Sequence, residues 1–439
     1  MDGTAVGEEL LRPLTTENRF ASVTDCMDAA EKIETGLVWF YSVQRRAAVE
    51  DAVSDLLAGW CILVFDGIAL SFETKNGNFR KPEKPETEKT VKGAKEAFTE
   101  SFRTNTALLR RRIRTPDLKC RERVLGRRTR SKTGLLYIEG IVNPAYVEEL
   151  ERRLSEIDID GVLNSGELEE FIPERPSPFP QMLVTERPDR FAGELLEGRV
   201  GLIVEGLPLG FVLPATFAEM LRAPDDLSGH FVIASALTLL RYISLFISVL
   251  LPAVYVAITM YHHEMIPTKL MLSMIEAKQN VPFSTAAEIL GMLISFELLQ
   301  EAGLRLPDSI GQTVSIIGGL IVGQSAVEAS VISPIVVIVV ALAGITGYTV
   351  PNQDMAAALR LCRMAMVLLS LVLGLFGIFM GILLLLYYLC TLENFGVAYM
   401  EPFCSGNVRE LLSVVLRPPI RLRKYRLRWL RPRDKRRQK

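Results

Sequence analysis

The sequence has 439 residues, and its 50 Lys and Arg nearly balance its 51 Asp and Glu, for a net charge of −1. The charges are unevenly placed, because the long segment from Phe231 to Val408 holds only a small share of them. The mean hydropathy of +0.24 is therefore an average over a polar part and an apolar part. This pattern excludes a single soluble globule and predicts a membrane domain attached to soluble domains.

The part of the chain before Phe231 is long enough to form one or two domains with cores of their own. Met1 to Leu14 has no basic segment followed by an apolar one, so we expect no cleaved signal peptide. The six cysteines are scattered without a CxxC pair, which argues against a disulfide framework or a zinc site. We therefore expect this region to lie in the reducing cytosol.

Two stretches of the soluble part match each other at a constant offset, without a gap. Ala52–Ile68 reads AVSDLLAGWCILVFDGI, and Phe191–Leu207 reads FAGELLEGRVGLIVEGL. Each has an amphipathic helix that ends in Leu-Leu-x-Gly, a short apolar strand, and an Asp-Gly or Glu-Gly turn. This predicts two related α/β subdomains, residues 1–115 (with a linker at Gly77–Glu88 and a basic helix at Phe102–Arg114) and residues 116–230.

In the second subdomain we predict four strands, two helices and a loop that resembles a calcium site. Glu156–Glu167, EIDIDGVLNSGE, resembles a calcium-binding EF-hand loop, but it begins with Glu and has no second copy, so we favour an ordinary loop. The predicted strands are Gly134–Glu139, Gln181–Thr185, Arg199–Glu205 and Leu209–Leu213, and the predicted helices are Pro144–Glu156 and Asp189–Glu197.

Four uncharged apolar runs between Phe231 and Val408 are long enough to cross a bilayer. A fifth segment, Phe283–Ala302, is interrupted by glutamates, and we predict that it is interfacial, re-entrant or buried in an assembly. The four runs are Tyr242–Met260, Ser309–Val327, Ala329–Val350 and Met364–Leu392.

The end of the chain, residues 409–439, forms a tail in which Arg and Lys far outnumber Asp and Glu. Basic flanks of membrane spans stay in the cytoplasm, so we expect the tail to be cytosolic and to contact lipid headgroups. Four spans then return the N-terminal domain to the cytosol as well. For the basic run Arg110–Arg112 we favour a solvated face or a subunit contact over nucleic acid.

The second run contains one stripe of small residues at helical spacing, together with side chains that can form hydrogen bonds. Small residues let helices approach closely in lipid, and polar ones can line a pore, so we expect helix packing, a pore-facing surface, or both. The acidic residues Glu297, Glu301 and Glu328 are candidates for a cation path. The alternative for them is an interfacial position or a pair with Arg305. The stripe and its polar neighbours are Gly311, Gln312, Ser315, Gly319, Gly323 and Gln324.

Motifs for catalysis and cofactor binding are missing from the sequence. It contains no P-loop, GxGxxG or Ser-His-Asp motif and only three His, so we predict no enzyme and no cofactor. His262 and His263 are adjacent and do not share a helix face, so we favour an interfacial cluster over a metal site.

Several segments, taken together, resemble the A subunit of the GerA family of spore germination receptors, nearly from end to end. They include VKGAKEAFTESFRTNTALLRRRI (Val91–Ile113), YIEGIVNP (Tyr137–Pro144), EMIPT (Glu264–Thr268), FELLQEAGLRLPDSIGQTVSIIGGLIVGQSAVEASVISP (Phe296–Pro334) and FGVAYMEP (Phe395–Pro402). The sporulation-stage paralogue of the same family is an alternative.

The resemblance implies an integral protein of the spore inner membrane that works with a permease-like B subunit and a lipoprotein C subunit. It also implies a ring-shaped homo-oligomer that acts as a nutrient-gated cation channel. A non-conducting signalling scaffold is the alternative function. A secondary transporter is disfavoured, because the membrane part shows no internal repeat.

Overall fold

The computed structural model describes residues 25–34, 43–57, 60–72, 84–88, 90–305, 323–406 and 408–438, together with Arg12. The chain forms two compact units. The first comprises Met1–Ile172, Val184–Pro214 and Lys424–Lys439, and the second comprises Pro173–Leu183 and Ala215–Arg423. We call them the α/β unit and the helical unit.

The α/β unit contains a sheet of five strands in the order β4-β5-β7-β8-β6. β4, β5, β7 and β8 pair with their neighbours in antiparallel fashion, and Leu135 faces Leu202 across the central pair. The strands β7 and β8 are buried along their whole length. The five strands are β4 (Leu118–Leu125), β5 (Ser131–Ile138), β6 (Leu183–Thr185), β7 (Val200–Val204) and β8 (Gly210–Leu213).

Four helices accompany this sheet, and their ends follow the local sequence. At α6, Asn143 caps the first turn by accepting a hydrogen bond from the N–H of Ala145, and Pro144 follows it at the first helical position. At the end of α8, Gly198 adopts a left-handed conformation with φ of 102°. The helices are α5 (Phe102–Arg112), α6 (Pro144–Glu156), α7 (Ser165–Phe171) and α8 (Pro188–Glu197).

The first subdomain repeats part of this arrangement. Its sheet has the order β1-β3-β2, which corresponds to β6-β8-β7 in the larger sheet. The offset that aligns Ala52 with Phe191 also places α3 on α7, β1 on β6, α4 on α8 and β2 on β7. The repeat is therefore longer than the matched stretches. In the described residues, the two segments therefore share the same order of helices and strands. The elements are α3 (Cys26–Glu34), β1 (Val43–Arg46), α4 (Val49–Leu57), β2 (Cys61–Phe65) and β3 (Ile68–Phe72).

Because of Glu149 on α6, the stability of the α/β unit should depend on pH. It accepts hydrogen bonds from Arg152 at 2.6 Å and from Arg153 at 2.7 Å. The bond from Arg152, with that from Arg153, outweighs partial burial and lowers the pKa of Glu149 from 4.5 to about 2. A carboxyl whose pKa is lowered by folding stabilises the fold above its unfolded pKa, and this stabilisation is lost as the pH falls through the folded pKa.

We therefore expect Glu149→Gln to lower the free energy of unfolding near neutral pH by about 0.5–1 kcal/mol. The difference from the unchanged chain should shrink as the pH falls from 4.5 toward 2. Thermal unfolding of the full chain in neutral detergent measures this difference in stability. The control is Glu148→Gln, which changes the exposed neighbouring residue. A difference that does not vary with pH would contradict this role of Glu149.

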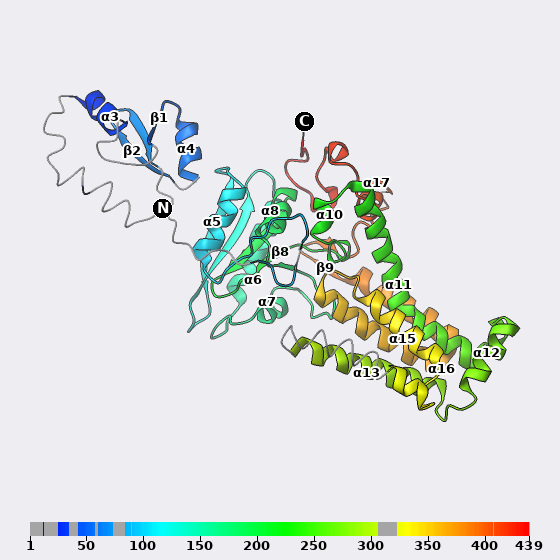
Figure 1. Cartoon of the computed structure of the whole chain (residues 1–439). Coiled ribbons are helices and arrows are strands. Elements are labelled where there is room, and N and C mark those ends of the chain that lie inside the picture. The colour runs from blue at the N-terminus through cyan, green and yellow to red at the C-terminus, as the bar shows by residue number, and fades with distance from the viewer. Residues whose placement is uncertain are drawn as a thin grey trace. The chain divides into compact units, whose positions relative to one another are not determined.

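In the helical unit, α11, α15 and α16 pack against one another, and α13 contacts both α11 and α15 (Figure 1). The main helices are α11 (Phe231–Tyr261), α12 (Thr268–Lys278), α13 (Thr285–Arg305), α15 (Pro334–Gly347), α16 (Gln353–Thr391) and α17 (Val408–Val415). Shorter elements are α9 (Phe217–Met220), α10 (Asp225–Ser228), β9 (Glu393–Asn394) and β10 (Val397–Ala398).

The prediction of four spans is not confirmed. Within the described residues, α11 and α16 are long and apolar enough to cross a membrane, whereas α15 has only 14 residues. Residues 309–322 of the second predicted run lie outside the described part. The fifth segment does form a helix, α13.

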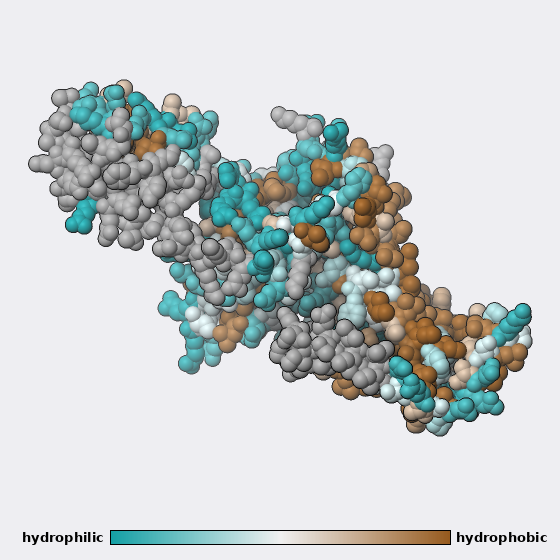
Figure 2. Space-filling model, viewed as in Figure 1, coloured by the Kyte–Doolittle hydropathy of each residue, from teal (hydrophilic) through white to brown (hydrophobic). Residues whose placement is uncertain are grey.

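Large apolar side chains are exposed on the two long helices, as the hydrophobic surface of the helical unit shows (Figure 2). Val372 is 73% exposed and Phe246 is 60% exposed, and with their exposed apolar neighbours they form a surface of the kind that marks membrane or protein contact. α16 is interrupted at Gly374, whose φ of 60° lies outside the helical region and which sits against Tyr261 of α11. The exposed apolar side chains on α11 and α16 favour a lipid-facing surface for the helical unit.

Candidate functional site: charged residues among the apolar helices

The small-residue stripe is described only in part. Gly311, Gln312, Ser315 and Gly319 lie outside the described residues. Gly323, Gln324 and Glu328 lie on one described helical segment, where Gln324 donates a hydrogen bond of 2.8 Å to Glu328. A Cβ on Gly323 would lie 3.5 Å from Val337 of α15, an ordinary contact, so nothing described there requires glycine.

Glu297 on α13 forms an ion pair with α16. Its Oε1 accepts a hydrogen bond of 2.6 Å from Nη2 of Arg363, and its Oε2 lies 3.6 Å from Nη1 of Arg360. Arg360 also donates a 2.9 Å hydrogen bond to Gln300, one turn further along α13. Glu297 thus has two arginine partners, and Glu301 lies at an exposed position one turn further along α13.

Arg363 is the most buried member of this cluster, with 3% of its side chain exposed. Besides Glu297, it contacts the carbonyl oxygen of Ala343 on α15 at 3.4 Å. A buried arginine is costly unless its charge is paired and its donors are bonded. Arg363 therefore joins α13, α15 and α16 through one charged group.

Glu288 forms a second connection between α13 and α15. Its side chain is fully buried, and its Oε2 accepts a hydrogen bond of 2.7 Å from the backbone N–H of Ser333, the N-cap of α15. Lys278 lies 3.5 Å from the other carboxylate oxygen. A carboxylate at a helix N-terminus is stabilised by the exposed N–H groups and the helix dipole.

The remaining sequence candidates have other partners. In the loop that resembles an EF-hand, Asp158 forms an ion pair with Arg127, and Asp160 lies 3.5 Å from Arg128. Glu167 accepts a 2.8 Å hydrogen bond from the N–H of Leu163. Within the described residues, no group of three or more His, Cys, Asp or Glu side chains is arranged to hold a metal.

The sequence was also compared with known proteins. A family model described as the Bacillus/Clostridium GerA spore germination protein matches residues 1–429. The chain belongs to the GerA family. This confirms the resemblance seen in the sequence.

Several relatives of this GerA chain carry spore germination names. Spore germination protein KA of Bacillus subtilis is 37% identical over 419 residues, which cover 94% of this chain and 76% of the relative. Spore germination protein GerLA of Bacillus cereus is 33% identical over 416 residues, covering 93% of this chain and 85% of the relative. The uncharacterized membrane protein YfkQ of Bacillus subtilis is 38% identical over 400 residues, covering 90% of this chain and 78% of the relative.

The GerA chain is also similar to a solved structure. It is the crystal structure of the N-terminal domain of the A subunit of the Bacillus megaterium spore germinant receptor GerK3, at 36% sequence identity. The match covers 49% of this chain and 79% of that chain, with a TM-score of 0.38.

Sequence reasoning missed two residues of the site in the GerA chain, Arg360 and Arg363. Both precede the uncharged run Met364–Leu392, so the pattern alone indicates only the flank of a span. In the structure they belong to the same helix as that run. Their spacing of three residues places them on one helix face. This spacing was the only local pattern that could have indicated a pair of charged site residues.

Proposed function

We propose that this chain is the A-type subunit of a nutrient germinant receptor and that copies of it assemble into a ring around a nutrient-gated cation path. The family match over residues 1–429 carries the proposal, and relatives named as spore germination proteins support it. The proposal places the receptor in the spore inner membrane, with a permease-like B subunit and a lipoprotein C subunit. Residues 1–230 and the tail then lie in the cytosol.

The charged residues of the helical unit support a path for ions. Ionisable side chains among apolar helices are expensive and commonly mark ion pathways. Glu297 and Glu288 lie on α13, and Glu328 lies on the segment that precedes α15. The four predicted spans of a single chain would enclose a path poorly, so the proposed path requires several copies.

A non-conducting scaffold is the second candidate, and the cluster at Glu297 favours it. Arg363 and Arg360 both neutralise Glu297, so this carboxylate does not present a free negative charge in the described state. In a channel, the pair must separate or the path must use the other acidic residues. In a scaffold, the pair would join the helices in every state.

Gly319→Leu tests the small-residue surface on which the proposed ring depends. A leucine there should prevent close approach of helices, so that assembly or conduction is lost while the α/β unit stays folded. The readout is nutrient-triggered germination of spores in which the variant is the sole A subunit.

Gly291→Leu is a suitable control, because a Cβ at Gly291 of α13 would meet no atom within 4 Å. Those spores should germinate normally. Normal germination of the Gly319→Leu spores would count heavily against a pore or packing role for the stripe.

A further inference from the structure

The end of the chain is folded onto itself. Tyr425 and Arg436 form an antiparallel bridge, and the N–H of Arg426 donates to the carbonyl of Lys435 at 3.0 Å. Between these strand-like segments lies a short 3-10 helix, Arg428–Leu430, whose Leu430 is fully buried. Residues 424–438 therefore form a defined loop, which we call the basic lobe, and not an extended tail.

Arg426 holds the basic lobe together and ties it to the α/β unit. Its side chain is 8% exposed, and its guanidinium donates to the carbonyl of Leu196 at 2.8 Å and to Asp434 at 2.7 Å. The N–H of Arg433 donates to the carbonyl of Ile141 at 2.9 Å, and Arg437 pairs with Glu197. These contacts fix the lobe to the end of α8 and to the loop before α6.

The single acidic residue of the basic lobe is already engaged. The N–H of Arg436 and the side chain of Arg426 both donate to Asp434 and lower the pKa of its carboxyl. Arg428, Arg431 and Lys435 are exposed, and their side chains form no hydrogen bond or ion pair with a residue that the structure describes. These three cationic groups therefore have no paired counter-charge among the described residues.

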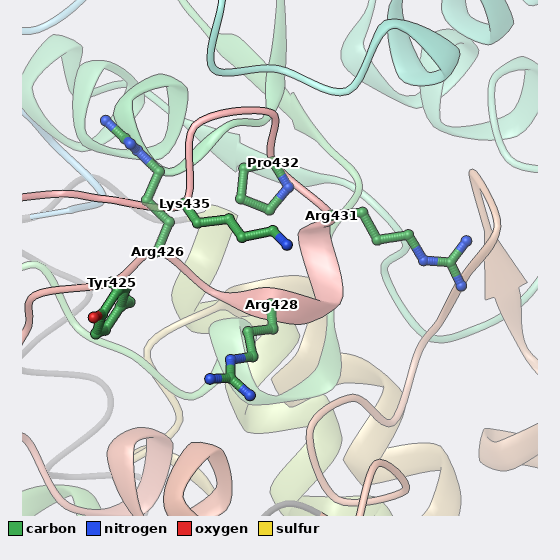
Figure 3. A pocket seen from close by; sticks show the side chains of 6 residues that line it. All are labelled: Tyr425, Arg426, Arg428, Arg431, Pro432 and Lys435. Atoms are coloured by element: carbon green, nitrogen blue, oxygen red, sulfur yellow. The ribbon is translucent and has the colours of Figure 1, made fainter.

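These cations border a pocket of about 390 Å³, a size usual for small-molecule sites. Figure 3 shows the Lys435 ammonium between Pro432 and Arg428, in the middle of the group, while Arg431 extends outward beside Pro432. The six lining residues are Tyr425, Arg426, Arg428, Arg431, Pro432 and Lys435.

We propose that this pocket binds a phosphate-bearing anion through Lys435 and the bordering Arg428, with the outward-directed Arg431 adding positive charge at the rim. A guanidinium offers two parallel N–H donors to a phosphate, an ammonium adds a point charge, and a phosphate has enough acceptor oxygens for several such groups. The buried Arg426 and Leu430 hold the lobe in shape, so part of the ordering cost is met before the ligand arrives. The anion is either the headgroup of an acidic lipid or a free phosphate compound.

The test uses the full chain in nanodiscs of zwitterionic phosphatidylcholine, titrated with inorganic pyrophosphate in a calorimeter. Saturable binding is expected, and Arg428→Gln combined with Lys435→Gln should weaken it about tenfold or more. The matched control, Arg433→Gln combined with Arg436→Gln, removes the same charge from the lobe but not from the pocket, and should change the affinity by less than about twofold. Thermal unfolding of each variant checks that the fold is kept.

A second arm identifies the source of the anion. In nanodiscs that contain acidic phosphatidylglycerol, a lipid headgroup in the pocket would abolish pyrophosphate binding, whereas a free phosphate ligand would still bind. Either result supports the pocket. No saturable binding in phosphatidylcholine discs, or equal weakening by the two double variants, would overturn the proposal.

Discussion

Glu297→Leu is expected to lower the free energy of unfolding of the helical unit by about 3–5 kcal/mol. The substitution leaves Arg363, 3% exposed, without its carboxylate partner. Within the described residues, the guanidinium then keeps the carbonyl of Ala343 at 3.4 Å as a hydrogen-bond partner, and this carbonyl carries no full charge. Thermal unfolding of the full chain in neutral detergent measures the loss.

Two further variants separate this effect from a general loss of charge. Glu276→Leu, which removes an exposed carboxylate from α12, should change the melting temperature little. Glu297→Leu combined with Arg363→Met removes both members of the ion pair and should recover most of the lost stability, because an apolar pair needs no counter-charge. If Glu297→Leu melts like the unchanged chain, the ion pair does not hold the helices together.

The second large effect is expected at Gly201, in the central strand β7. A Cβ at this position would lie 2.1 Å from the ring of Phe191 on α8, which is fully buried and packs edge-to-face against Phe98 at 5.5 Å. Gly201→Ile should therefore destabilise the α/β unit by about 3 kcal/mol or more. Gly193→Ala, in α8 where a Cβ meets nothing within 4 Å, should be neutral or slightly stabilising.

The internal repeat suggests how to rescue this variant. At the constant offset of the repeat, Gly201 corresponds to Ile62 and Phe191 corresponds to Ala52, so the small and large residues are exchanged between the two subdomains. Gly201→Ile combined with Phe191→Ala copies the first subdomain and should be more stable than either single variant. Additive losses in thermal unfolding of the three variants would show that the two positions do not compensate each other.

Much of the α/β unit was predictable because its signals are local. Pro144–Glu156 was predicted as a helix, and the helix has these bounds. The predicted strand Arg199–Glu205 brackets β7, because buried apolar runs between turns indicate central strands. The repeat was visible in sequence because the same helix, strand and turn recur at a constant offset.

The charged site was not predictable from the sequence, because its contacts are distant along the chain. Arg363 and Glu297 are separated by 66 residues, and nothing in their local patterns indicates the pairing. The basic lobe is similar, since Arg426 bonds to Leu196 across 230 residues. The alternating basic and apolar residues of this lobe predict a surface segment, but they do not indicate which helix or strand the segment contacts.

Potassium flux from liposomes that contain this chain with its B-type and C-type partners tests the proposed channel most directly. The proposal predicts a flux that appears when nutrients are added, requires this chain, and is lost with Gly319→Leu. A complex that is assembled and binds nutrients, yet passes no potassium, would contradict the channel and favour a signalling scaffold.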